Sequence, residues 1–173
     1  ITESTMIGHN PKTPGGLGLG VGTTLRFAEL EKIGKKDTPY ILIIEKSFDF
    51  DDVAQQINHF VANGYLITAA IMQSDDGVLV NNRLTKKIPI VDEVSYIDKV
   101  PVNMLAAVEV AETGRGVSQL SNPYGIATVF ELDSEATKNI VPVARALIGN
   151  RSAVVIKTPK GDVKARTIPA GKI

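Results

Sequence analysis

The pattern of apolar and polar positions predicts a β-α-β unit in the first half of the chain. The run YILIIEK is continuously apolar and rich in β-branched residues, which is typical of a strand buried on both faces. Behind Asp49, which can cap a helix, apolar residues recur at helical spacing until Asn63-Gly64 ends the pattern. The segment YLITAAIM is predicted to be the next strand, reached by a right-handed crossover.

The later pattern predicts strands and helices in alternation. QSDDG indicates a turn, after which VLVNN and KKIPIVDEVSYI are expected to be extended. Helical spacing from Pro101 to Gly114 predicts a second helix, and GIATVFEL predicts a strand. A third helix is expected to start at Asp133-Ser134 and to be kinked or divided by Pro142. SAVVIK and VKARTI flank TPKGD and predict a terminal hairpin.

These elements predict an α/β fold: a single domain over residues 1–173, in which a mixed β-sheet is layered with helices and a second small sheet. With 173 residues and 43% apolar residues, the chain is large enough to bury one core. The opening ITESTMI alternates like a strand, and VKARTIPAGKI closes on a strand pattern. We therefore expect a domain excised from a larger chain.

The charge balance disfavours two classes of partner. The 19 basic and 19 acidic residues cancel, so neither nucleic acid nor an anionic membrane is expected to bind. No apolar run approaches the roughly 20 residues needed to span a bilayer. Cysteine is absent, which excludes disulfides, thiol catalysis and cysteine-zinc sites and fits a reducing compartment.

The segment NPKTPGGLGLGVG raises the question of phosphate binding. Its glycines do not follow the G-x-G-x-x-G spacing of a dinucleotide site, no Gly-Lys-Ser/Thr follows, and the continuation TTLRF is β-like. We interpret the run as a connection between two strands in which glycine permits close backbone approach, with direct phosphate binding as the alternative. Thr13, just before the glycines, could offer an oxygen to a hard cation.

Acidic residues cluster in two motifs. Asp75 and Asp76 lie in SDDG, and Asp92 follows the apolar IPIV. Taken separately, each has an ordinary interpretation as a turn former or as a solvated strand end. If these strand ends and Thr13 converge on one edge of a sheet, their oxygens suit magnesium or calcium rather than zinc.

The sequence contains no catalytic constellation. The two histidines, His9 and His59, lack His-x-x-x-His spacing, and no Gly-x-Ser-x-Gly elbow is present. Three arginines are spread along the chain and fit solvated or helix-end positions: Arg115, Arg145 and Arg151. We therefore expect no catalytic residues.

Several motifs resemble one family closely. IGHNPKTPGGLGLGVG, MQSDDGVLVNNRL, IPIVDEVSYID and the long stretch from SNPYGIATVF to VKARTIPAG resemble the large subunit of the diol and glycerol dehydratase reactivating factors. Only FAELEKIGKKDTPY matches loosely. In that family the large subunit is a chaperone-like ATPase with an actin/Hsp70-like core that carries an inserted swiveling domain. The resemblance implies that this chain is that swiveling β/β/α-type domain, that it is not itself an enzyme, and that ATP or ADP binds only the full-length protein.

The resemblance further implies a protein-interaction and switching role. The domain would dock the reactivase small subunit and help release damaged adenosylcobalamin from inactivated diol or glycerol dehydratase. The implied partners are the small subunit, the dehydratase and the rest of the large subunit. The implied location is the cytoplasm, with association with a bacterial microcompartment.

A metal site is also implied by the resemblance. In the family, a magnesium or calcium ion at the small-subunit interface is held by a threonine and two aspartates of this domain and by a glutamate of the small subunit. Matched motif by motif, these residues are Thr13, Asp75 and Asp92, with Asp76 still open in place of Asp75. Because the partner supplies one ligand, metal affinity and subunit docking would be reciprocal.

Two other functions remain open at the level of the sequence. A free-standing metal-dependent phosphotransfer or hydrolytic domain could use Asp75, Asp76 and Asp92, but it would need a nucleophile or base that the sequence does not offer. A purely structural spacer would bind neither metal nor partner. The sequence does not separate a diol from a glycerol dehydratase as the protein served.

Overall fold

The computed structural model describes residues 3–9, 18–34, 36–112, 114–157 and 164–167. All the strands in these ranges belong to one mixed sheet with the order β5-β4-β3-β2-β6-β7-β1-β8. The strands are β1 Glu3–His9, β2 Gly18–Arg26, β3 Pro39–Ile44, β4 Leu66–Met72, β5 Ile90–Val91, β6 Leu105–Val110, β7 Ser152–Lys157 and β8 Lys164–Thr167. The helices are α1 Phe50–Ala62, α2 Gly77–Arg83, α3 Pro123–Phe130 and α4 Ser134–Ala146, with short 3-10 turns η1 Phe27–Lys32 and η2 Ile97–Lys99.

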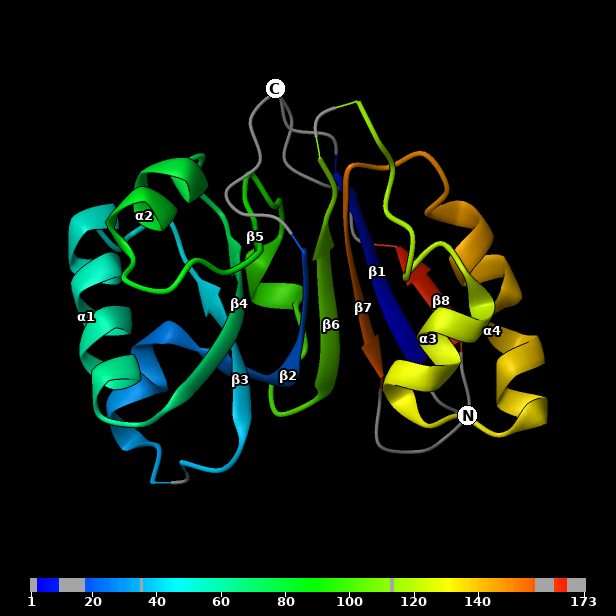
Figure 1. The fold of residues 1–173 in the computed structure, drawn as a ribbon, viewed down its shortest axis with the longest axis horizontal. Coiled ribbons are helices and arrows are strands. Elements are labelled where there is room, and N and C mark those ends of the chain that lie inside the picture. Colours follow the sequence, from blue (N-terminus) through cyan, green and yellow to red (C-terminus); the bar gives the residue numbers. More distant parts are fainter. Residues whose placement is uncertain (1–2, 10–17, 35, 113, 158–163, 168–173) are drawn as a thin grey trace.

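The sheet is curled, and its helices lie outside the curl. Figure 1 shows α1 and α2 beside one half of the sheet and α3 and α4 beside the other half. The inner face joins the two halves in one apolar cluster that contains Ile41 and Ile71 from one half and Val108 and Ile156 from the other. The outer face forms two separate clusters, one under each pair of helices. The molecule therefore has a central core between sheet halves and two lateral cores beneath helices.

The predicted mixed sheet with helices is confirmed, but the predicted second sheet is wrong for the described part of the chain. The two halves are joined because β2 pairs with β6 in antiparallel register from Gly18↔Val110 to Thr23↔Leu105. The halves pack on each other as two sheets would, but hydrogen bonding continues around the bend. Within the described ranges, no helix is long and apolar enough to cross a membrane.

The β-α-β prediction is confirmed in β3, α1 and β4. β3 pairs with β4 in parallel register, and residues 41–44 of β3 are essentially inaccessible to solvent. The side chain of Asp49 caps α1 by accepting a hydrogen bond from the Asp51 backbone N–H at 3.1 Å. Gly64, just beyond the helix, has φ +91, the left-handed conformation that glycine adopts most easily.

Three predicted elements have the wrong type. VLVNN belongs to helix α2, the helix expected after Pro101 is strand β6, and the strand expected at GIATVFEL is helix α3. In β6, consecutive residues are buried because the strand is covered on both faces, so helical and strand spacing match its apolar positions equally. In α3, the start signal precedes the apolar run: Asn122 caps the helix and Pro123 occupies its first turn.

Two further predictions about the C-terminal half are wrong. Helix α4 is not divided; Pro142 lies inside one continuous helix. Pro142 and Lys138 are both exposed, so the Lys138 carbonyl that loses its helical partner is accessible to water. β7 and β8 do not form a hairpin, because β1 lies between them and pairs antiparallel with β7 and parallel with β8.

The glycine run continues into strand β2. A Cβ atom on Gly20 would lie 2.3 Å from the backbone oxygen of Thr68, and one on Gly22 would lie 2.8 Å from the backbone oxygen of Pro39. The close backbone approach that we predicted is therefore observed at these two glycines. Residues 10–17, which include Gly15 and Gly16, lie outside the described residues.

Candidate functional site

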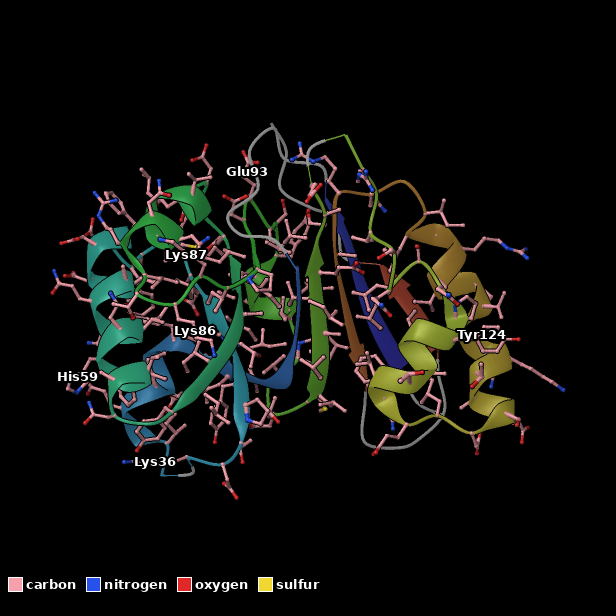
Figure 2. The ribbon with its side chains drawn as sticks, in the orientation of Figure 1. Lys36, His59, Lys86, Lys87, Glu93 and Tyr124 are labelled. Atoms are coloured by element: carbon pink, nitrogen blue, oxygen red, sulfur yellow. The ribbon has the colours of Figure 1, made fainter. Side chains whose placement is uncertain are left out.

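The two acidic motifs meet at one corner of the sheet. β4 and β5 are parallel neighbours, so the segments that follow them, residues 73–76 and 92–94, leave the same edge of the sheet. The Glu93 backbone N–H donates to the Ser74 oxygen at 3.0 Å, and the Val94 N–H donates to the Met72 oxygen at 3.0 Å. These bonds place the loop carrying Asp75 beside the loop carrying Asp92. Figure 2 labels Glu93 at this corner.

Asp92 is held inside the corner. Its side chain is buried, with the residue 4% exposed, and its Oδ2 accepts a hydrogen bond from the Gly77 backbone N–H at 3.0 Å. Gly77 is the first residue of α2, and it is also buried. Because the bond joins residues from different loops, it ties the start of α2 to the end of β5.

The other two acids lie in the turn before α2. Asp75 is exposed and Asp76 is half-buried. Asp76 occupies the N-cap position, but its side chain makes no capping bond, and its backbone oxygen accepts the first helical bond from Val80 at 2.9 Å. Asp75 is thus the more accessible of the two residues.

Thr13 lies outside the described residues, and the ligand roles of Thr13, Asp75 and Asp92 stay predictions. Among the residues that the structure describes, no group of three or more His, Cys, Asp and Glu side chains could hold a metal ion. The predicted ligand set, with two carboxylates and a threonine, does not require such a group. His59 lies on α1, where its ring contacts Phe60 edge-on at 5.6 Å.

The backbone is unusual around Asp92. Glu93 has φ +58 and Tyr96 has φ +57, both in the left-handed region that residues other than glycine rarely adopt. These conformations were not predicted from the sequence, because neither glutamate nor tyrosine is typical of a left-handed turn. The two turns direct the chain from β5 around the corner and into η2.

A second buried acid, Glu109 in β6, is 6% exposed and was not predicted from the sequence. Its carboxylate accepts backbone N–H bonds from Ser118 at 3.0 Å, Gln119 at 3.1 Å and Leu120 at 2.8 Å. A signal was present, since an acid inside the apolar run LAAVEV must find donors if the run is buried. This acid anchors the loop that leads to α3.

A groove of about 600 Å³ lies between α3 and α4. Its two threonines are engaged locally: the Thr128 hydroxyl donates to the Tyr124 backbone oxygen at 2.8 Å, and the Thr137 hydroxyl donates to the Asp133 backbone oxygen at 2.6 Å. Tyr124 at its rim is 75% exposed and lies far from Glu93 in Figure 2. This groove is separate from the acidic corner.

Comparison with known proteins gives a family for this arrangement. The family described as "DD-reactivating factor swiveling domain" matches residues 1–163. The chain belongs to this family. It is 65% identical over all 173 residues to the propanediol dehydratase-reactivating factor large subunit of Citrobacter freundii and to the diol dehydratase-reactivating factor large subunit of Klebsiella michiganensis. The chain spans 28% of the length of each of these relatives.

Solved structures agree with the sequence relatives. The diol dehydratase-reactivating factor in nucleotide-free form superposes with a TM-score of 0.87 and 63% identity, covering 96% of this chain and 28% of that chain. Glycerol dehydratase reactivase superposes with a TM-score of 0.88 and 53% identity, covering 94% of this chain and 28% of that one. The resemblance read from the motifs and the α/β fold class are both confirmed.

Proposed function

We propose that this chain is the swiveling module of a dehydratase-reactivating factor large subunit. It docks the reactivase small subunit and helps release damaged adenosylcobalamin from an inactivated diol or glycerol dehydratase. The observation that carries the proposal is the family match over residues 1–163 together with 65% identity to reactivating-factor large subunits. The module itself is not an enzyme in this proposal, and ATP hydrolysis is assigned to the rest of the full-length protein.

The acidic corner is the proposed point of docking, and its residues fit a hard divalent cation. The donors are carboxylate oxygens, the type that magnesium and calcium prefer. The Asp92 carboxylate occupies the space that a Cβ on residue 77 would fill. Asp75 is exposed on the adjacent loop. Asp75 and Asp92, with Thr13 and a glutamate of the small subunit, would hold the ion, which would link the two subunits electrostatically.

The proposal is tested by substituting Asp92 in the full-length large subunit. Asp92→Ala removes one of the two carboxylates that this chain offers, so we expect weaker small-subunit binding and a weaker dependence of that binding on divalent metal. Size-exclusion chromatography of the mixed subunits, with magnesium or with chelator, measures both effects. Asp37→Ala, which removes an exposed carboxylate from a different loop, is the matched control.

Two outcomes would contradict the proposal. If neither Asp92→Ala nor a chelator changes small-subunit binding, docking does not depend on a metal ion at Asp92. Turnover of phosphate esters or nucleotides by the isolated chain, abolished by Asp92→Ala, would instead support the metal-dependent hydrolytic alternative.

A further inference from the structure

Residue 77 has room for no side chain. A Cβ built on Gly77 would lie 2.7 Å from Oδ2 of Asp92, 3.1 Å from its Cγ and 3.2 Å from Cγ2 of Ile90. Gly77 is not among the glycines with positive φ in the described part of the chain. The position therefore requires glycine because of the space that Asp92 occupies, and not because of an unusual backbone conformation.

The residues around Gly77 cannot easily move to accept a methyl group. Ile90 and Val91 pair with Ala70 and Ile71 of β4, which fixes the strand that carries Asp92. On the far side of Asp92, the Glu93 N–H bond to Ser74 holds the chain in place. Because Asp92 is 4% exposed, a displaced carboxylate would have to move within a packed environment.

One glycine thus sets the place of the carboxylate in two ways. Its N–H donates to Oδ2 at 3.0 Å, and its missing side chain allows that bond to form. Both effects restrict the Asp92 side chain through contacts within this chain. A ligand that is already ordered loses less conformational entropy on binding, which raises affinity.

We propose that Gly77 is a positioning residue for the divalent cation, acting through Asp92. This inference rests on the proposed function, because it concerns the same ion. It also gives a physical reason for the composition of SDDG: Asp75 is exposed on the turn, and two residues later the glycine fixes the partner acid from the neighbouring loop. In this proposal Gly77 preorganises Asp92, and Asp75 and the small subunit supply further ligands.

The experiment measures calcium binding to the full-length large subunit, with the small subunit present in excess, by isothermal titration calorimetry well below the unfolding temperature. We expect Gly77→Ala to lower calcium affinity by about tenfold or more, the range typical for residues that orient a metal ligand. Gly34→Ala is the matched control, because its Cβ would meet no atom within 4 Å. Its calcium affinity should equal that of the unchanged protein.

A second variant avoids dependence on the folding of Gly77→Ala. Asp92→Glu keeps the charge and leaves residue 77 intact, but its extra methylene moves the carboxylate away from the Gly77 N–H. We expect a similar loss of calcium affinity. Calcium affinity that is unchanged in either folded variant would overturn the positioning role, even if Gly77→Ala lowers the melting temperature, since a purely structural glycine would affect stability alone.

Asp92→Asn separates this inference from the proposed function. The asparagine oxygen can still accept the Gly77 N–H, but the charge is lost, so calcium binding should fall while the fold remains. If Asp92→Asn abolishes calcium binding and Gly77→Ala leaves calcium affinity unchanged, the proposed ion site is supported and the proposed role of Gly77 is wrong. If the unchanged protein and Asp92→Asn bind calcium equally, the proposed ion site itself is wrong.

Discussion

Asp92 and Glu109 are both buried acids, and each lies near a glycine that has no room for a side chain. Glu109 accepts three backbone N–H groups from the consecutive residues Ser118, Gln119 and Leu120. Gly125 of α3 packs against the same loop, where a Cβ would lie 2.2 Å from the Gln119 oxygen. The Glu109 region is thus a carboxylate surrounded by donors from one loop.

The Asp92 region is built differently. The Gly77 backbone N–H, at the start of a helix, donates to its carboxylate, and the adjacent loop presents the exposed carboxylate of Asp75. The N–H donors around Glu109 offset its negative charge, whereas the loop beside Asp92 carries a further acid, Asp75, which adds negative charge to that corner of the sheet. Burial of an acid therefore does not identify a binding site by itself; the character of the neighbouring groups does.

The largest effect on stability is expected at Glu109. Glu109→Ala leaves the loop N–H groups without their acceptor, and we expect a loss of about 3 kcal/mol or more in the free energy of unfolding. Urea unfolding measures the loss, and Glu109→Gln, which keeps one acceptor oxygen, should lose less. The calcium affinity of the folded variant should be unchanged. A lower calcium affinity would contradict the proposed difference between Glu109, as a structural acid, and Asp92, as a metal ligand.

Gly125→Ala should have the next largest effect. The added Cβ would meet the backbone oxygen of Gln119, which cannot rotate away as a side chain can, so about 2 kcal/mol of stability should be lost. Thermal unfolding measures this loss. Gly77→Ala is the matched comparison, because only the substitution at residue 77 should change calcium affinity. Equal changes in calcium affinity for the two variants would contradict this expectation.

A smaller effect is expected at the start of α3. Asn122 caps this helix by accepting a bond from the Tyr124 backbone N–H at 2.9 Å. Asn122→Ala should cost about 1 kcal/mol of stability. Asn122→Ser, which can still cap, is the control, and a loss in the serine variant as large as in the alanine variant would show that capping is not the cause.

The smallest effect on stability, together with a large effect on calcium, is expected at Asp75. This side chain is exposed, so Asp75→Asn should change the free energy of unfolding by less than about 0.5 kcal/mol. Calcium affinity should nevertheless fall, because a ligand charge is removed. Asp76→Asn is the matched control; if it reduces affinity and Asp75→Asn does not, Asp76 is the ligand.

The sequence predicted the elements whose signals are local. The strand-helix-strand unit was correct because Asp49 marks the helix start and Gly64 marks its end within the segment itself. β6 was mistaken for a helix, because a strand buried on both faces has no alternation to reveal it. GIATVFEL was mistaken for a strand, because its β-branched residues outweighed the Asn122-Pro123 start signal just before it.

The sequence by itself determined the family, the α/β fold class and the unit of β3, α1 and β4, since these depend on residue types and on neighbours a few positions apart. Only the tertiary structure decided that β1 lies between β7 and β8, that the sheet curls instead of dividing, and that Gly77 fits against Asp92. These features depend on pairing and packing between distant segments, whose free energies are absent from any local pattern. The candidate site depends on both the sequence and the tertiary structure. The motifs pointed to Asp75 and Asp92 as candidates, and the parallel pairing of β4 with β5 makes their loops neighbours.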